Sequence, residues 1–243
     1  MDRDYYTTLA SVQKDHWWYT ARRTILTKVL ERVTGEGLPS GKLYDLGCGV
    51  GANLPVLEKF GSTVGVDFSA EAVSFCHEQG HPSARQANLD SLEGLEDGSG
   101  SVVVLADVIE HLDDERLCLA AAHRALASGG ALIVTVPAYM FLWGPSDEIA
   151  HHRRRYTESS LRAVIEPLFQ IEHVSYFNTL LFGMIAAGRF VERVFKRGGG
   201  DGAGIPPKAV NSLLREIFAT EALAVTRARV PFGVSILCIA RKR

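Results

Sequence analysis

The most informative part of the sequence runs Leu43-Tyr44-Asp45-Leu46-Gly47-Cys48-Gly49-Val50-Gly51, where an acid in a short apolar run precedes three glycines at alternate positions. Glycine has no Cβ, so a ligand can approach the backbone closely and the chain can adopt positive φ in a tight turn. A second strand-like run, Thr63-Val64-Gly65-Val66-Asp67, ends in a lone carboxylate. Such an acid can accept hydrogen bonds from ribose hydroxyls. The two segments together predict an adenosine-containing ligand.

Strand and helix patterns alternate on both sides of these two runs. Three of the candidate strands are rich in valine with little alternation, which is typical of strands buried on both faces. This rhythm predicts βαβ units, a parallel sheet and helices on both sides of it. The candidate strands are 42–46, 63–67, 84–88, 102–107 and 131–136, and the helical patterns between them are 51–60, 70–79 and 114–127.

The pattern changes after Pro137. Residues 138–156 are loop-like and dense in aromatic, His and Arg residues. Ser128-Gly129-Gly130 is interpreted as a helix stop before the fifth strand, and the glycine cluster at 197–202 is expected to be mobile. Further helices are predicted at 16–34, at 157–168 and over much of 179–224, and further strands at 171–177 and 234–241.

The composition narrows the functional class. The chain has 243 residues, of which 47% are hydrophobic and 22% charged, as in ordinary soluble globular proteins. The net charge of −2 gives no reason to expect a nucleic-acid partner. The charged N-terminus and the lack of a long uncharged apolar run lead us to expect a cytoplasmic protein. Four scattered cysteines without a CxxC pair favour a reducing compartment over a disulfide framework or a zinc site: Cys48, Cys76, Cys118 and Cys238.

Five blocks in order carry a family resemblance. Asp45–Gly51, with its GxGxG spacing, is followed by Val66-Asp67-Phe68-Ser69, and the remaining blocks are Gln86–Asp90, Leu105–Leu112 and Arg124–Leu132. Over roughly residues 16–243 the chain resembles class I S-adenosylmethionine-dependent methyltransferases, and its N-terminal segment resembles a bacterial subgroup of them that acts on small molecules. The chain departs from the family at Asn88, where Asp is common; this keeps an acceptor but loses charge assistance.

The resemblance implies an α/β fold with a Rossmann-like, seven-stranded, mostly parallel sheet. Its last strand is antiparallel, helices cover both faces, and a helical insertion lies between the last two strands. We expect a single domain over residues 1–243, divided into an N-terminal aromatic helical lid (1–40), a cofactor-binding core (41–137), an acceptor-side loop and helical insertion (138–232) and the last strand (233–243).

The resemblance also implies how S-adenosylmethionine would bind, with S-adenosylhomocysteine as the product. The glycine turn meets the methionine part above Asp45, Asp67 takes both ribose hydroxyls, and Phe68 flanks the adenine. Asn88 and the backbone of Leu89 bond the edge of the adenine. The implied cofactor residues are Arg22, Asp45, Gly47, Cys48, Gly49, Asp67, Phe68, Asn88, Leu89 and Asp107.

Structural alternatives stay open for several of these residues. Asp45 and Asn88 could belong to turns, and Asp67 could be the acid at a helix N-terminus. The segment His16-Trp17-Trp18-Tyr19 either docks on the sheet or forms a lid, in which Arg22 would pair with the carboxylate of the ligand.

The acceptor is expected near the loop that leaves the fifth strand, because ligands of open α/β sheets bind at the carboxyl ends of strands. A histidine is suited to deprotonating the acceptor, so His151 or His152 is the candidate general base, with packing or pairing to acids as the alternative. No metal site is predicted, because adjacent histidines seldom point the same way. Further acceptor-side candidates are His111, Trp143, Arg154 and Tyr156.

These features lead us to predict methyl transfer by in-line displacement to a small-molecule acceptor of amphiphilic or anionic character. The arginines at 153–155 form either a solvated run or an anion site. The apolar residues at 176–185 and 190–195 form either core, a lipid-like acceptor channel or a peripheral membrane contact. Two other functions stay open: a non-catalytic module that binds S-adenosylmethionine, and an NAD-dependent oxidoreductase.

Overall fold

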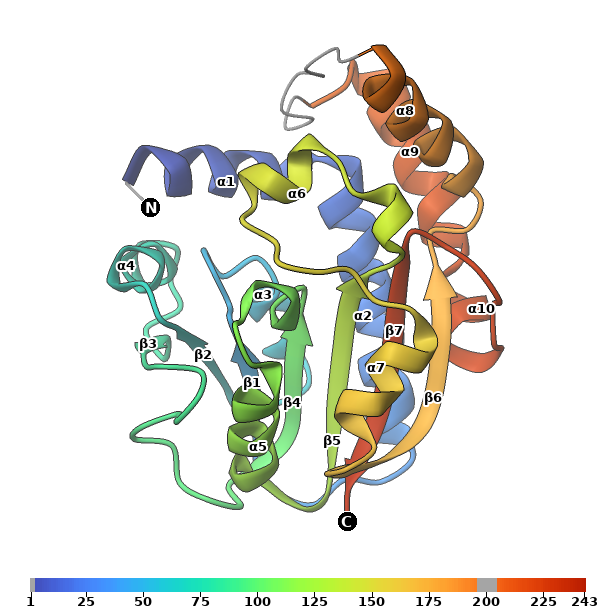
Figure 1. Cartoon of the computed structure of the whole chain (residues 1–243). Coiled ribbons are helices and arrows are strands. Elements are labelled where there is room, and N and C mark those ends of the chain that lie inside the picture. Colours follow the sequence, from blue (N-terminus) through green and yellow to red (C-terminus); the bar gives the residue numbers. More distant parts are fainter. Residues whose placement is uncertain (1–2, 196–204) are drawn as a thin grey trace.

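A seven-stranded sheet lies at the centre of the computed structural model, which describes residues 3–195 and 205–243 (Figure 1). The strand order is β3-β2-β1-β4-β5-β7-β6, and β7 runs antiparallel to its neighbours β5 and β6. This confirms the expected fold, while the predicted glycine cluster at 197–202 lies outside the described residues. The strands are β1 Lys42–Leu46, β2 Thr63–Asp67, β3 Arg85–Gln86, β4 Gly100–Ala106, β5 Leu126–Pro137, β6 Phe169–Phe177 and β7 Ser235–Lys242.

Two strands differ more than the others from their predicted ranges. β3 is shorter than the predicted 84–88, because the chain turns at Asn88, whose Oδ1 accepts a hydrogen bond from the backbone of Asp90. β5 begins five residues before the predicted 131, since Leu126 pairs with Gly100 of β4 across a register shift. Ser128-Gly129-Gly130 therefore lies inside β5 as an irregularity, with Gly129 at φ 76°, and the prediction of a helix stop there is wrong.

The helices follow the predicted pattern between the strands. The predicted 51–60 shortens to one turn, and an unpredicted helix precedes α2 at the N-terminus. Three helices of the described residues lie between β6 and β7. The helices are α1 Arg3–Asp15, α2 Trp17–Gly35, α3 Leu54–Leu57, α4 Ala70–Glu78, α5 Glu115–Ala125, α6 Pro145–Ile149, α7 Glu158–Ile165, α8 Phe182–Phe195, α9 Lys208–Thr220 and α10 Ala222–Arg227, with short 3₁₀ turns at η1 Ile109–His111 and η2 Met140–Leu142.

The core has two layers, one on each face of the sheet. Because successive side chains of a strand point to opposite faces, Val103 and Leu105 of β4 pack with α5 and α7, whereas Val102 and Val104 pack with α2, α9 and α10. In Figure 1, α5 and α7 lie in front of the sheet and α2 lies behind it. Across the described ranges, no helix combines the length and apolar character needed to cross a membrane.

The topology determines where a ligand can bind. The strand order reverses between β1 and β4, and open α/β sheets bind ligands at such a switch point, beyond the carboxyl ends of the strands. The glycine turn follows β1, Asp67 ends β2, and η1 follows β4 at this edge. In Figure 1, α1 and α6 lie above the same edge.

Candidate functional site

The turn after β1 explains why two of its glycines are needed. Gly47 has φ 76° and donates its amide to the Val66 carbonyl at 2.7 Å. A Cβ on Gly47 would lie 2.6 Å from Cγ2 of Val108, so packing from η1 excludes a side chain there. Gly49 has φ 53°, but a Cβ on it would meet nothing within 4 Å. The backbone at Gly49 therefore borders open space that a ligand can enter.

Asp67 holds this turn from the next strand. Its Oδ2 accepts from the Gly49 amide at 2.8 Å and its Oδ1 accepts from the Ser69 amide at 3.0 Å. Burial raises the pKa of Asp67, and these backbone hydrogen bonds oppose the rise. Each carboxylate oxygen keeps a further lone pair for a ligand hydroxyl. Phe68 follows with 63% of its surface exposed, which leaves a free aromatic face beside the carboxylate.

Asp45 is the least satisfied group beneath the turn. It is 1% exposed, and its Oδ2 has no hydrogen-bond partner within residues 3–195 and 205–243. Burial and the nearby Asp67 raise the pKa of Asp45 to about 7. A buried, unpaired carboxylate is costly, and a cationic group bound above the glycine turn would supply the missing partner.

The remaining predicted cofactor residues divide into two groups. Cys48 is buried, and its contact with Cys76 together with burial raises the pKa of its thiol, so Cys48 contributes backbone atoms to the turn. Leu89 is also buried. Asn88 is exposed and its Oδ1 accepts from the Asp90 amide at 2.9 Å, which is the turn role left open by the sequence. Its side-chain nitrogen remains available as a donor.

Arg22 reaches the site from α2 and is held there by two polar side chains. Its Nη1 forms an ion pair with Oδ2 of Asp107, and its Nη2 donates to Oγ1 of Thr135 at 2.9 Å. Thr135 in turn donates to Oδ1 of Asp107 at 3.2 Å. Asp107 has φ 58°, a conformation that costs energy for a residue with a Cβ. Arg22 therefore orients Asp107 at the end of β4, and this network occupies the guanidinium expected to meet a ligand carboxylate.

The N-terminal aromatic segment docks on the body of the protein. Trp17 and Trp18 of α2 pack against Phe218 of α9, with ring centroids 6.0 and 5.4 Å apart. The unpredicted α1 is the element that covers the glycine turn, because Tyr6 packs with Val50 and Ala72. The spacing of Tyr6, Leu9 and Ala10 along one helix face was the signal in the sequence for this contact.

Asp147 organises the loop after β5. It is fully buried and accepts two hydrogen bonds from Arg155, one from the Gly144 amide and one from Nδ1 of His152, all between 2.8 and 2.9 Å. Burial alone would raise the pKa of Asp147, but the hydrogen bonds from His152 and Arg155 outweigh it and lower the pKa to about 2. Asp147 therefore holds His152 in a fixed orientation.

The three consecutive arginines are all tied to carboxylates of the protein. Arg153 pairs with Asp113 at 2.6 Å, and Arg155 pairs with Asp147. Arg154 pairs with Glu115 and also donates to the Leu112 carbonyl at 2.9 Å. These contacts connect the loop to the segment after β4, and they leave less positive charge for an anionic acceptor than the sequence suggested.

The other acceptor-side candidates are not gathered at one point. Tyr156 is buried, and its hydroxyl donates to the Ile109 carbonyl at 3.4 Å, so it supports η1 from below. Trp143 is half-buried at the end of η2. His151 is exposed and has φ 55°. Only His152 of the two adjacent histidines meets another predicted residue, His111.

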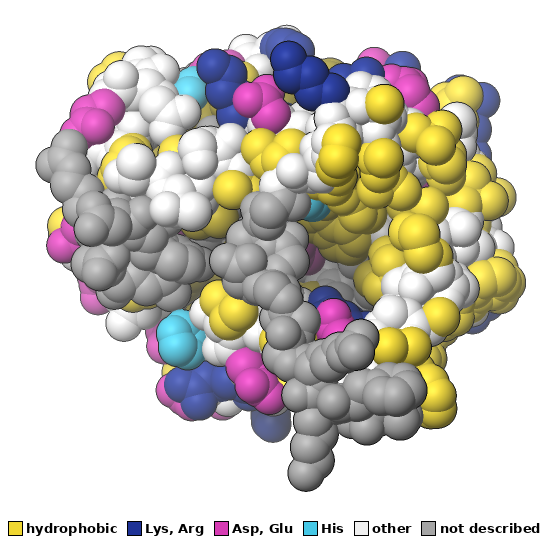
Figure 2. Space-filling view, turned by 90° about the horizontal axis from the view of Figure 1, so that it is seen from above, with side chains coloured by type: hydrophobic (Ala, Val, Ile, Leu, Met, Phe, Trp, Pro, Cys, Tyr) yellow, Lys and Arg dark blue, Asp and Glu magenta, His cyan; other side chains and the backbone are white. Residues whose placement is uncertain are grey.

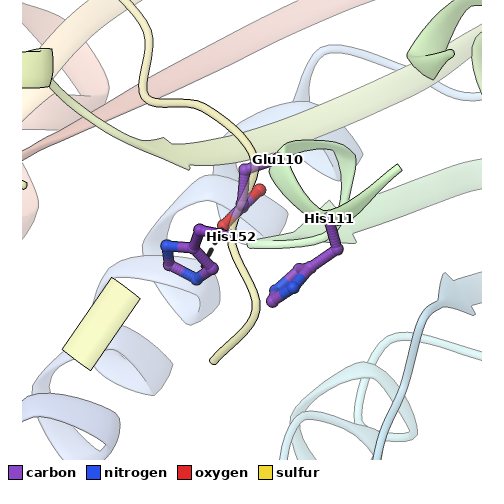
Figure 3. A group of neighbouring side chains, drawn as sticks. All are labelled: Glu110, His111 and His152. Atoms are coloured by element: carbon purple, nitrogen blue, oxygen red, sulfur yellow. Dashed lines mark ion pairs between the residues drawn. The ribbon is translucent and has the colours of Figure 1, made fainter. Parts of the chain in front are cut away.

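His111 and His152 meet at Glu110, which the sequence analysis had not singled out. The two rings lie edge to face with centroids 4.6 Å apart, and Nε2 of His152 is 4.0 Å from Oε1 of Glu110. Figure 3 shows the three side chains pointing toward one another. Burial and Asp107 raise the pKa of Glu110 well above its usual range, while burial and His152 lower the pKa of His111 to about 4. The position of Glu110, directly before His111, was the available sequence signal.

An apolar wall borders the site on the side of α8. Tyr139 stacks on Tyr176 and on Phe141 with centroids 5.2 and 5.1 Å apart, and Phe182 packs against Phe232. Figure 2, seen from above, shows hydrophobic side chains gathered along one side of a hollow. The exposed hydrophobic residues of these segments are Met140, Phe141, Leu180, Met184, Phe190, Val191 and Phe232.

Comparisons with known proteins support the fold. Residues 44–134 match the family model described as a methyltransferase domain. Over 137 residues the chain is 26% identical to a probable S-adenosylmethionine-dependent methyltransferase of Mycolicibacterium smegmatis, covering 54% of this chain and 49% of that protein. The chain thus spans about half the length of this curated relative.

Solved structures share the fold at low identity. A chain from the complex between the Haloferax volcanii Trm112 methyltransferase activator and the putative methyltransferase has a TM-score of 0.61 and 15% identity, covering 96% of this chain and 92% of that one. A SAM-dependent methyltransferase from Archaeoglobus fulgidus has a TM-score of 0.56 and 19% identity, covering 90% and 94%. The similarity extends over nearly the whole chain, including the segments outside residues 44–134.

Proposed function

We propose that this chain, whose residues 44–134 match a methyltransferase domain, transfers a methyl group from S-adenosylmethionine to a small-molecule acceptor. The observation that carries this proposal is the buried Asp45 carboxylate, whose Oδ2 has no hydrogen-bond partner among the described residues and which lies beneath a glycine turn held by Asp67. The turn has open space at Gly49. The two carboxylates and the open turn between them fit a ligand that has a cationic group at one end and a ribose at the other.

Each residue of the turn has a defined task in holding this donor. The Gly47–Gly49 backbone admits the amino-acid end, and the ionised Asp45 carboxylate balances its ammonium group. The free lone pairs of Asp67 accept from the ribose hydroxyls, and the exposed ring of Phe68 lies against the adenine. When bound, S-adenosylmethionine supplies a methyl group on a positively charged sulfur, which is open to displacement by a nucleophile.

The part of the site that faces the methyl acceptor orients the acceptor and removes its proton. Asp147 fixes Nδ1 of His152, so its Nε2 is the nitrogen that can take part in chemistry. His152 is therefore the better candidate for the general base, and the exposed His151 is the poorer candidate. Holding the nucleophile about 3–3.5 Å from the methyl carbon supplies a large part of the rate enhancement that positioning can give.

The proposed acceptor is amphiphilic. The exposed hydrophobic residues from η2, α8 and the segment before β7 offer an apolar wall beside the polar group of His111 and His152. The arginines at 153–155 are committed to Asp113, Glu115 and Asp147, so the polar end of the acceptor is better matched by a hydroxyl than by a phosphate.

A thermal-shift screen tests the donor first. S-adenosylmethionine and S-adenosylhomocysteine should each raise the melting temperature of the purified chain, and NAD should not. A shift with NAD alone would favour the oxidoreductase instead. A panel of amphiphilic hydroxyl compounds with labelled S-adenosylmethionine then separates an enzyme from a non-catalytic module, because only an enzyme releases S-adenosylhomocysteine in proportion to a methylated product.

A further inference from the structure

Glu110, His111 and His152 form a compact cluster from two segments far apart in the sequence. η1 supplies Glu110 and His111, and the loop after α6 supplies His152. One ligand atom of each lies within 4.8 Å of the others, and Figure 3 shows them converging on one point. The backbone amide of Arg153 donates to the Glu110 carbonyl at 2.9 Å, so the two segments are held in register.

Glu110 is the unusual member of this cluster. Its side chain is 0% exposed, and neither carboxylate oxygen has a hydrogen-bond partner among the described residues. The nearest guanidinium groups do not fill this role, because Arg22 is paired with Asp107 and Arg155 with Asp147. A buried carboxylate left without donors is costly. A bound cation would remove that cost.

A hydrogen bond to Asp147 holds His152 in position for the same ion. Nδ1 of His152 is hydrogen-bonded to Oδ1 of Asp147 at 2.8 Å, which directs its Nε2 toward Glu110. Asp147 is itself fixed by Arg155 and by the Gly144 amide. Metal-binding histidines usually have a carboxylate of this kind on the second ring nitrogen. The ring of His111 lies edge to face against the ring of His152, with centroids 4.6 Å apart.

We propose that Glu110, His111 and His152 bind one divalent transition-metal ion. Two imidazole nitrogens and one carboxylate suit Zn²⁺, Fe²⁺, Co²⁺ or Mn²⁺, whereas Mg²⁺ and Ca²⁺ prefer sites built from oxygen. Three protein ligands leave at least one coordination position open, as in metal sites that take part in chemistry.

The location of the cluster suggests what the ion does in the reaction. This role rests on the proposed methyl transfer. The cluster lies three residues beyond Asp107, at the edge where the donor turn opens. A hydroxyl of the acceptor at the open position would have a lower pKa, and its proton would leave to solvent while the oxygen keeps the electron pair. The same ion would fix the oxygen in place. His152 would then act as a ligand in place of a free base.

Metal binding to the full chain without methyl donor tests this proposal. After treatment with a chelator, the protein is titrated with Zn²⁺ by calorimetry and with Co²⁺ by absorption spectroscopy. We expect one equivalent of each, a Co²⁺ spectrum without thiolate bands, and no response to Mg²⁺. Glu110→Gln and His152→Gln should each weaken Zn²⁺ binding at least 100-fold, and Asp147→Asn should weaken it 10- to 100-fold.

The adjacent histidine provides a matched control. His151→Gln, at an exposed position, should leave Zn²⁺ affinity unchanged. Glu110→Gln keeps the size of the side chain and cannot ionise, so it should remain folded by circular dichroism; if it does not, His111→Gln replaces it in the series. Absence of binding, thiolate bands, or equal affinity in the Glu110, His111 and His152 variants would overturn the proposal. Because the assay contains no donor, these outcomes leave the proposed methyl transfer unaffected.

Discussion

Asp45→Asn should make the ligand-free protein more stable at alkaline pH. The carboxyl is 1% exposed, and burial and Asp67 raise its pKa from 3.8 to about 7. The folded state therefore keeps a proton that the unfolded chain has already lost at pH 5 or 6. Stability is consequently highest at low pH and falls as the pH rises toward 7. Asparagine has a similar shape and does not ionise, so the variant should lack this component of the decline.

The size of the effect follows from the pKa. One pKa unit corresponds to about 1.4 kcal/mol, so ionised Asp45 lowers the free energy of unfolding by up to about 4 kcal/mol. Between pH 4.5 and pH 8 we expect the wild-type protein to lose about 3 kcal/mol more than the variant. Burial also raises the pKa of Glu110. Comparing the two proteins at each pH cancels the contributions of groups that do not interact with Asp45.

Urea unfolding at both pH values, without ligand, measures this difference. Asp97→Asn, at an exposed carboxylate, is the matched control and should follow the wild type. The reasoning is refuted if Asp45→Asn and the wild type lose the same stability between pH 4.5 and pH 8. That result would mean that Asp45 is ionised at little cost in the folded protein.

Two further predictions concern the turn itself. Gly47→Ala should lower the free energy of unfolding by about 1–3 kcal/mol, because its Cβ would meet Val108 at 2.6 Å. Gly49→Ala should cost less stability but more ligand affinity, since its Cβ would enter open space. Urea unfolding and calorimetry of both variants test this, and equal loss of stability would count against it. Because a cationic ligand favours ionised Asp45, S-adenosylhomocysteine should bind about fivefold more tightly at pH 7 than at pH 6, and calorimetry of Asp45→Asn should show no such change.

The strands next to the glycine turn could be predicted because their signals are local. β1 and β2 match the predicted ranges residue for residue, since each is a short buried run that ends at a turn or an acid. The start of β5 could not be predicted in this way. It depends on pairing with Gly100 of β4 and on an irregularity at Gly129, and both arise from contacts distant in the sequence.

The same distinction explains the site. Asp45, Gly47, Gly49 and Asp67 could be located because one motif and the strand after it carry them. Which partner His152 meets depended on how the loop after β5 folds back toward η1, through Asp147 and the three arginines. Nothing in the sequence near His152 indicates that Glu110 lies beside it without donors of its own.

Calorimetric titration with S-adenosylhomocysteine tests the central claim most directly. Wild-type protein should bind one equivalent, and Asp67→Ala should bind at least tenfold more weakly, because two hydrogen bonds to a charged acceptor are lost. Asp97→Asn should bind like the wild type, and NAD should give no heat of binding. No binding of S-adenosylhomocysteine to folded wild-type protein, or equal binding by Asp67→Ala, would contradict the account.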